Sequence, residues 1–304
     1  MRISVFDLHC DTPSLLWLRD ESLQKNSGAV NLQRARSLSS YTQFFAFCPF
    51  GNEMRRYAAW SAEQRFCAML RHFGSVSEEL QKMENVTAYL SLEGAEAIGC
   101  DEGRLEPLWR QGFRMTTLTW NYSNALAGPH TTEEGLTQAG RRFVCRAQKI
   151  GMQIDVSHLS ERAFWDLCDI TSAPLAASHS NSRACCGHSR NLSDAQARAL
   201  IAQGGLIGIN LYAPFLNESG KATFDDVFLH IAHFLELGGE SNLALGGDLD
   251  GCDCLPQNFS GVDSYPTLAE ALVQRGLSRE TVEALFYRNA ARFFAAARGR
   301  SEDK

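Results

Sequence analysis

Short apolar runs rich in β-branched and aromatic residues recur along the chain and alternate with stretches of helical periodicity. Runs of four to eight such residues predict buried strands. We expect eight strands, at residues 3–9, 41–47, 86–92, 113–120, 152–157, 174–178, 205–212 and 243–247. The helical pattern covers residues 53–83, 135–150, 160–170, 193–203, 224–237, 267–275 and 278–296.

This alternation of strands and helices is typical of parallel βαβ units in the α/β class. Eight units in 304 residues favour a (β/α)8 TIM barrel over an open doubly wound sheet. No glycine-rich nucleotide-binding fingerprint follows the first strand, which also argues against the doubly wound alternative. No internal boundary is visible, so we expect a single domain over residues 1–304.

Two histidines stand at the ends of two successive predicted strands. His158 follows the run 152–157, His179 follows the run 174–178, and the helix between them starts after Ser160, a favourable N-cap. A right-handed βαβ crossover places such strands side by side and in the same direction. A lone histidine is more often a hydrogen-bonded structural residue. A pair at the edge where α/β proteins carry their sites favours a shared ligand.

Acidic and imidazole side chains also end three other predicted strands. His9 and Asp11 lie two residues apart and share a face, although alone they are equally consistent with a surface turn. Glu93 follows a buried run directly, where an unpaired carboxylate is costly, but it could also cap the next helix. In a barrel the carboxyl ends of all strands face one opening. We therefore expect one cluster of His9, Asp11, Glu93, His158, His179 and Asp248.

A cluster of imidazoles and carboxylates suits zinc or a similar divalent ion. Six ligands are too many for one tetrahedral catalytic ion that must keep a water. Two ions that share a bridging carboxylate are the natural number, and two-metal sites hydrolyse amides and esters. The cluster therefore predicts two divalent ions, with Zn²⁺ favoured.

Composition narrows the range of partners. The net charge is −6 without a basic block, which argues against nucleic acid and anionic membranes and favours a small-molecule substrate. The first residues predict a strand instead of a signal peptide, and no apolar run reaches the length of a membrane span, so we expect a cytoplasmic protein. Ten scattered cysteines are by default free thiols. Two closely spaced pairs could instead form a disulfide or bind a metal, namely Cys185-Cys186 and Cys252-Asp253-Cys254.

Several motifs, in order along almost the whole chain, resemble the membrane (renal-type) dipeptidase family, peptidase family M19, among the amidohydrolase-like metal barrels. They are His9-x-Asp11, Leu92-Glu93-Gly94, 154–158 (IDVSH), 178–180 (SHS) with Arg190-Asn191, and 246–251 (GGDLDG). Each motif is weak alone, and their ordered combination is specific.

The resemblance implies a binuclear zinc dipeptidase. Glu93 would bridge the ions, His9 and Asp11 would bind one of them, and His158 and His179 would bind the other. Asp248 would contact metal and water and act in proton transfer, and Arg190 would bind the free carboxylate of the dipeptide. The family often accepts a D-residue at the second position and suggests a homodimer.

One position departs from the family pattern. Animal members carry a substrate-contacting histidine at the end of the fourth strand, where this chain has Trp120. The indole N–H can donate a hydrogen bond but does not exchange a proton at neutral pH. Asn121, Tyr122, His130 or His188 could substitute. We expect Trp120, Asn121 and, at the end of the seventh strand, Tyr212 to contact substrate together with Arg190.

Two alternatives remain open at this stage. The first is an amidohydrolase of the same architecture that acts on N-acyl amino acids, lactones or cyclic amides, because a fold does not fix its substrate. The second is a catalytically dead barrel that binds a metal or peptide, which only Trp120 favours.

Overall fold

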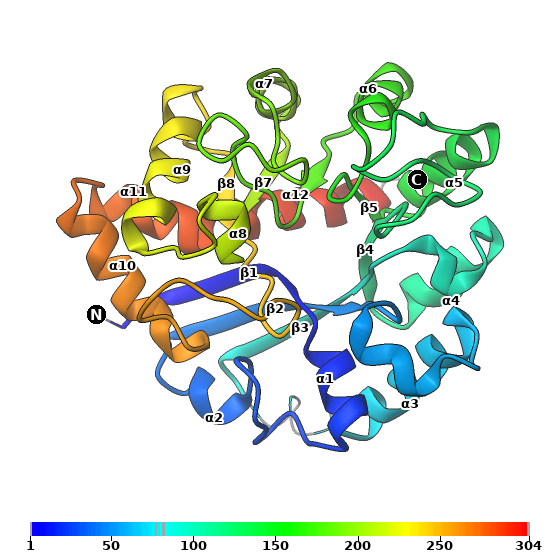
Figure 1. Ribbon diagram of the computed structural model, residues 1–304, viewed down its shortest axis with the longest axis horizontal. Helices are drawn as coiled ribbons and strands as arrows, with labels where there is room; N and C mark the ends of the chain where they lie inside the picture. Colours follow the sequence, from blue (N-terminus) through cyan, green and yellow to red (C-terminus); the bar gives the residue numbers. More distant parts are fainter. Residues whose placement is uncertain (1, 77, 79, 81–82, 303–304) are drawn as a thin grey trace.

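The architecture was analysed in a computed structural model, which describes residues 2–76, 78, 80 and 83–302. Eight parallel strands close into a barrel in sequence order, β1 to β8 (Figure 1). The predicted TIM-barrel fold is confirmed. The strands are β1 (Ser4–Cys10), β2 (Ser40–Phe47), β3 (Val86–Leu92), β4 (Phe113–Thr117), β5 (Gln153–Asp155), β6 (Ala176–Ala177), β7 (Leu206–Ile209) and β8 (Leu243–Leu245).

Helices surround the barrel (Figure 1). The α-helices are α1 (Thr12–Arg19), α2 (Leu32–Ala35), α3 (Ala62–Val76), α4 (Leu105–Arg110), α5 (Gln138–Lys149), α6 (Glu161–Ile170), α7 (Asp194–Ala202), α8 (Ala213–Leu216), α9 (Phe224–Glu236), α10 (Tyr265–Gln274), α11 (Arg279–Glu283) and α12 (Asn289–Glu302). The 3₁₀ segments include η1 (Asn52–Tyr57), η3 (Ala95–Ile98), η4 (Glu102–Arg104) and η5 (Val262–Ser264), and η6 (Ala284–Arg288) is a π-helical turn. No helix in the described part of the chain is long and apolar enough to cross a membrane.

Some predicted boundaries were wrong. Residues 53–83 do not form one helical region, because η1 ends at Tyr57 and α3 begins after Ser61; residues 77, 79, 81 and 82 lie outside the described residues. Ser61 starts α3 with a capping box, in which its hydroxyl accepts from the Gln64 N–H and its own N–H donates to the Gln64 side chain. Helix α1 was not predicted. Strands β4 to β8 are shorter than the apolar runs, which continue into buried loops.

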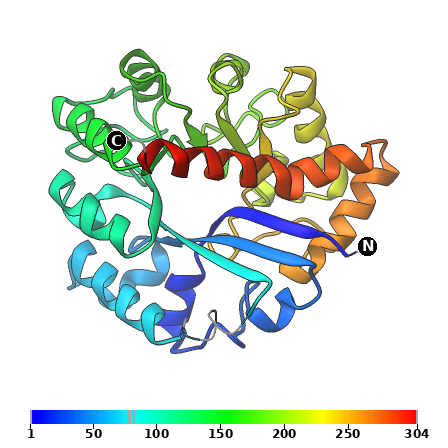
Figure 2. The ribbon, with the colours of Figure 1, turned by 180° about the vertical axis from the view of Figure 1, so that it is seen from behind.

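Helix α12 closes the end of the barrel at which the strands begin. Figure 2 shows it crossing the barrel (red), and its first turn is held to β8 because the Asn289 side chain donates to the Leu243 carbonyl. Phe294 packs against Phe6 and Phe44, with ring centroids 5.6 and 4.7 Å apart. The opposite end, where the strands stop, therefore carries the open site.

Two glycines let the loop after β6 enter the barrel. A Cβ added at Gly208 or Gly246 would lie 1.9 or 1.8 Å from the carbonyl oxygen of Ser178. Only glycine permits this close approach. The backbone directly before His179 can therefore pack against the backbone of β7 and of the segment after β8.

Candidate metal centre and active-site pocket

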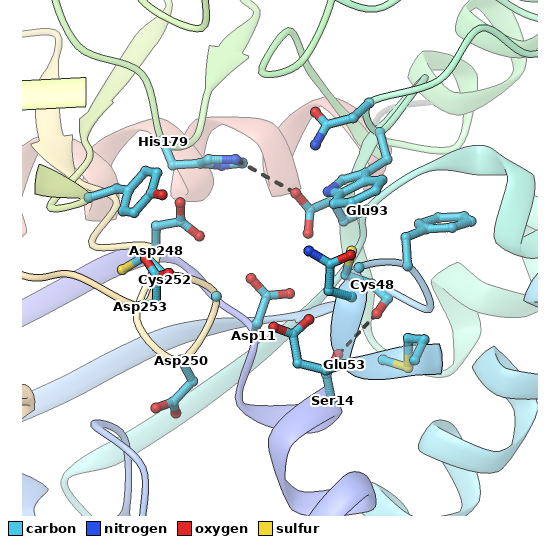
Figure 3. Close-up of a pocket in the computed structure, with 18 of the residues that line it drawn as sticks. Asp11, Ser14, Cys48, Glu53, Glu93, His179, Asp248, Asp250, Cys252 and Asp253 are labelled. Atoms are coloured by element: carbon cyan, nitrogen blue, oxygen red, sulfur yellow. Dashed lines mark hydrogen bonds and ion pairs between the residues drawn. The ribbon is translucent and has the colours of Figure 1, made fainter. Parts of the chain in front are cut away.

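The six predicted ligand residues come together at the carboxyl ends of the strands. His9 lies near the end of β1 and Asp11 directly follows that strand. The other four come after later strands: Glu93 after β3, His158 after β5, His179 after β6 and Asp248 after β8. Figure 3 shows Asp11, Glu93, His179 and Asp248 directed into one pocket. Five of these residues are buried, and Asp248 is partly exposed.

Glu93 stands between two sets of imidazoles. Its Oε1 lies 2.8 Å from His158 Nε2 and 3.7 Å from His179 Nε2. Its Oε2 lies 3.5 Å from His9 Nε2. Each oxygen of one carboxylate thus faces a different ligand group, as a carboxylate that bridges two cations must.

The half of the cluster around His9 is richer in carboxylates. His9 Nε2 lies 3.5 Å from Asp11 Oδ2 and 3.9 Å from Asp248 Oδ1. Asn210 orients Asp248, because its side-chain amide donates to Asp248 Oδ2 at 3.0 Å. One oxygen of Asp248 therefore stays directed at the cluster.

The unsatisfied atoms of the cluster fit metal ligation. His9 Nε2, Asp11 Oδ1 and Glu93 Oε2 are buried and have no hydrogen-bond partner. Unpaired buried polar atoms cost free energy unless something binds them. The ligating atoms of His9, Glu93 and His179, and likewise those of His9, Asp11 and Asp248, lie within 4.8 Å of one another. Nitrogen and oxygen donors of these types suit zinc and related divalent ions.

The charges in the cluster are mutually dependent. Burial and the neighbouring Glu93 carboxylate raise the pKa of Asp11 to about 8. Burial would raise the pKa of Glu93 too, but His9 and His158 hold it well below its ordinary value. Burial and the positive charge of Arg190 lower the pKa of His158 to about 4. Burial would lower the pKa of His9, but Glu93 and Asp11 raise it well above its ordinary value. The ionisable groups of the cluster therefore depend on one another for their charge, as in a site that exchanges protons for cations.

Backbone strain accompanies the site. His158 and Asp248 have φ angles of 72° and 55°, in the left-handed region that non-glycine residues seldom adopt. Asp250, two residues further on, has a φ of 65°. Such residues persist where the surrounding structure holds them, and they concentrate at functional sites.

Asn121 contacts a candidate ligand. Its Oδ1 lies 2.8 Å from His158 Nδ1. An amide oxygen only accepts, so His158 donates from Nδ1, and its Nε2 faces Glu93 Oε1. The predicted contact of Asn121 with substrate stays a prediction.

A pocket of about 910 Å³ opens over the cluster, and Trp120, Arg190 and Tyr212 line it. Arg190 is only 5% exposed. Among the described residues no acidic side chain forms an ion pair with its guanidinium, and the Asp248, Glu93 and Asp155 carboxylates act on it only through longer-range attraction. The Arg190 guanidinium lies over the Phe215 ring, 5.6 Å from its centroid.

Trp120 forms an aromatic wall of the pocket. Its ring stacks on Phe50 at 5.6 Å with an interplanar angle of 17°, and Tyr122 lies against it. Its centroid is 6.4 Å from that of His158. The indole thus stands beside the metal cluster.

Sequence reasoning gave no firm role to several residues that line this pocket. His130 and His188 lie on the wall near Arg190, with ring centroids 6.2 Å apart. Cys48, at the end of β2, brings its thiol within 4.8 Å of the Asp11 and Glu93 carboxylates. Its position directly after an apolar strand, as at Glu93, was the available signal. Cys252 also lines the pocket, and burial raises its thiol pKa well above the ordinary value.

A closed parallel barrel with a buried histidine and carboxylate cluster at its carboxyl end defines the class of metal-dependent hydrolase barrels. The model of the membrane dipeptidase family, peptidase family M19, matches residues 1–303. The chain belongs to this family, and the predicted family resemblance is confirmed.

Relatives agree with this assignment. A Klebsiella pneumoniae protein from the pqqA 5′ region, described as uncharacterized, is 34% identical over 210 residues, 65% of this chain and 77% of its own length. Dipeptidase tcpJ of Claviceps purpurea is 34% identical over 209 residues, 67% of this chain and 49% of its own length. The chain thus matches about half the length of the fungal dipeptidase. A metallopeptidase structure from Rhodobacter sphaeroides, 26% identical, has a TM-score of 0.85 over 97% of this chain and 99% of that chain.

Proposed function

We propose that this chain is a binuclear zinc dipeptidase that hydrolyses free dipeptides. One observation carries the proposal. The guanidinium of Arg190 is buried and forms no ion pair with an acidic side chain of the described residues, and it lines the same pocket as Glu93, whose two oxygens face different histidines. A buried cation without a partner costs stability. A substrate carboxylate would supply that partner.

His9, Asp11 and Asp248 would hold one ion, and His158 and His179 would hold the other, with Glu93 between them. When bound, a pair of divalent ions supplies a water of low pKa and polarises the scissile carbonyl. The chain contributes the buried ligand side chains and holds them in their orientation.

Asp248 is the candidate for proton transfer. Burial raises the pKa of its carboxyl, although His9 acts in the opposite direction. A carboxyl with a raised pKa can take a proton at Oδ1 and deliver it to the leaving amine. The Asn210 amide keeps the other oxygen occupied.

Arg190 would bind the carboxylate of the C-terminal residue with its planar guanidinium. A longer peptide has an amide in place of this carboxylate, so it would leave the buried charge unpaired. Trp120 and Tyr212 would flank the substrate on the pocket walls. This arrangement favours dipeptides over longer chains.

Dipeptides that end in a D-residue belong in the substrate range that we propose. The Rhodobacter sphaeroides relative was crystallised with a phosphinate mimic of L-Ala-D-Ala, and its barrel superimposes on nearly the whole of this chain. The expected cytoplasmic location and homodimer stay predictions.

The test is hydrolysis of free L,L- and L,D-dipeptides by the zinc-loaded protein, with N-acetyl amino acids alongside. We expect cleavage of free dipeptides, loss of cleavage with a chelator, and recovery with zinc. Cleavage of N-acetyl amino acids alone would refute the dipeptidase proposal in favour of another amidohydrolase. Inactivity toward all substrates, with metal bound, would favour the dead barrel.

A further inference from the structure

Two buried aspartates outside the candidate ligand set occupy matching places in the barrel. Asp7 on β1 is fully buried and Asp155 on β5 is 2% exposed. Asp7 Oδ1 accepts hydrogen bonds from the N–H groups of His9 and Gly247, both at 3.0 Å. Asp155 Oδ1 accepts from the N–H groups of Ser157 and Ser178, both at 2.9 Å.

Each aspartate therefore ties together two neighbouring strand ends that carry candidate ligands. Asp7 joins the end of β1, with His9, to the backbone just before Asp248. Asp155 joins the segment before His158 to the residue before His179. Hydrogen bonds to a buried carboxylate are strong, and they fix the positions of the groups that donate them.

The Oδ2 atoms of the two aspartates have different hydrogen-bond partners. Asp7 Oδ2 accepts from the Tyr265 hydroxyl, and within the described part of the chain the hydrogen bonds lead no further from there. Asp155 Oδ2 is bonded to the Ser178 hydroxyl, whose oxygen lies 2.6 Å from His179 Nδ1. The other hydroxyl near Ser178, that of Ser157, is 3.4 Å away and at most a weak partner.

Hydrogen-bond polarity determines the direction of this second chain. A carboxylate only accepts, so the single hydroxyl proton of Ser178 points to Asp155. The Ser178 oxygen must then accept from His179, which places the imidazole proton on Nδ1. His179 Nε2 is left with its lone pair, and this nitrogen lies 3.1 Å from His158 Nε2 and 3.7 Å from Glu93 Oε1.

We propose that Asp155 and Ser178 are positioning residues that set the tautomer of His179, so that its Nε2 is free to bind metal. The inference rests on the proposed metal centre for its purpose, but the tautomer itself is a property of the chain alone. Partners of this kind commonly change metal affinity about 10- to 100-fold.

The substitution Asp155→Asn gives the sharpest test, because it reverses the direction of the hydrogen bonds from His179 through Ser178 to residue 155 while it conserves the shape of the side chain. The amide must keep its oxygen at the Oδ1 position, where two N–H groups donate. Its NH₂ then faces Ser178 and donates to the hydroxyl oxygen. Ser178 must turn its proton toward His179 Nδ1, and His179 then carries its proton on Nε2, the nitrogen that should bind metal.

Asp7→Asn is the matched control. It makes the same change in a buried aspartate with the same two backbone donors. Its second oxygen contacts a tyrosine hydroxyl and no imidazole. It should lower stability and leave the tautomer of His179 unchanged.

The experiment records the nitrogen spectrum of ¹⁵N-histidine-labelled protein in chelator, and then zinc binding by competition with a coloured chelator. A His179→Gln variant assigns the resonance. We expect an Nδ1–H tautomer in wild type and Asp7→Asn, and an Nε2–H tautomer in Asp155→Asn with zinc binding to one site weakened at least 10-fold. Wild-type tautomer and affinity in a folded Asp155→Asn protein would overturn the inference.

Ser178→Ala provides a second measure if Asp155→Asn does not fold. It removes the acceptor without creating a competing donor, so zinc binding should weaken several-fold and by less than in Asp155→Asn. If Ser178→Ala bound zinc with wild-type affinity, the proposed role of Ser178 in setting the tautomer of His179 would also be overturned. Failure to cleave dipeptides would refute only the proposed function, because neither the tautomer nor zinc binding depends on turnover.

Discussion

Replacing Arg190 by methionine tests how the pocket selects its substrate. The guanidinium is 5% exposed, and among the described side chains it has no acidic partner. A hydrogen bond to a charged group contributes about 1.5–3 kcal/mol, and truncating one partner of a buried charge pair costs about 2–5 kcal/mol. With about 3 kcal/mol lost, kcat/KM for a free dipeptide should fall roughly 100-fold, since 1.36 kcal/mol corresponds to tenfold.

The assay compares a free dipeptide with its C-terminal amide in wild type and in the variant. Wild type should prefer the free acid strongly, and Arg190→Met should abolish most of that preference by slowing only the acid. The thermal midpoint should not fall, because the variant removes a buried charge that lacks a partner. Equal losses for acid and amide, or an unchanged preference, would refute the assignment.

Arg183 offers a matched control on the same loop. It is paired with Glu161 at 2.9 Å and bonded to the Asn191 carbonyl, and it does not line the pocket. Arg183→Met should leave the acid preference intact. A similar loss in both variants would point to general disorder of the loop.

Three further predictions concern the metal cluster and the barrel. Because burial and Glu93 raise the folded pKa of Asp11 from 3.8 to about 8, its contribution to stability is present below about pH 4 and lost as pH rises toward 8. Chelator-treated protein should therefore melt at lower temperature at pH 9 than at pH 7.5, a range above the ordinary titration of histidine, and zinc should remove this difference; a flat profile in chelator would contradict the charge assignment. Asn121→Ala removes the acceptor for His158 Nδ1 and should weaken zinc binding about 10-fold or more in a chelator competition, whereas unchanged affinity would show that the contact is incidental. Phe294→Ala at the closed end should cost about 3–5 kcal/mol in denaturant unfolding with zinc affinity unchanged, and a loss below about 1 kcal/mol would mean that α12 does not seal the barrel.

The eight strands were predictable because most of them are buried on both faces and appear as continuous apolar runs, although β3 is only partly buried along its middle. Their ends were not, because the loops after β4 to β7 stay buried as they converge on the site. Helix α1 was missed since it is short and begins with Thr12-Pro13. The capping box at Ser61 is visible in the sequence as Ser61-x-x-Gln64 and marks the start of α3.

The six ligand candidates were found because each follows a strand directly, and parallel strands bring their ends together. The residues behind them were not found. Asp7 and Asp155 lie within strands, where the sequence gives no sign of which backbone amides they will meet. Asn121 looked like a pocket residue, and only the fold shows its bond to His158.

The most direct test of the account is activity as a function of bound metal. Metal-free protein would be titrated with zinc while free dipeptide hydrolysis and bound zinc per chain are measured together. One oxygen of Glu93 faces His9 and the other faces His158. This arrangement predicts that full activity requires two equivalents of zinc per chain. Full activity at one equivalent, or two bound equivalents without dipeptide hydrolysis, would contradict the account.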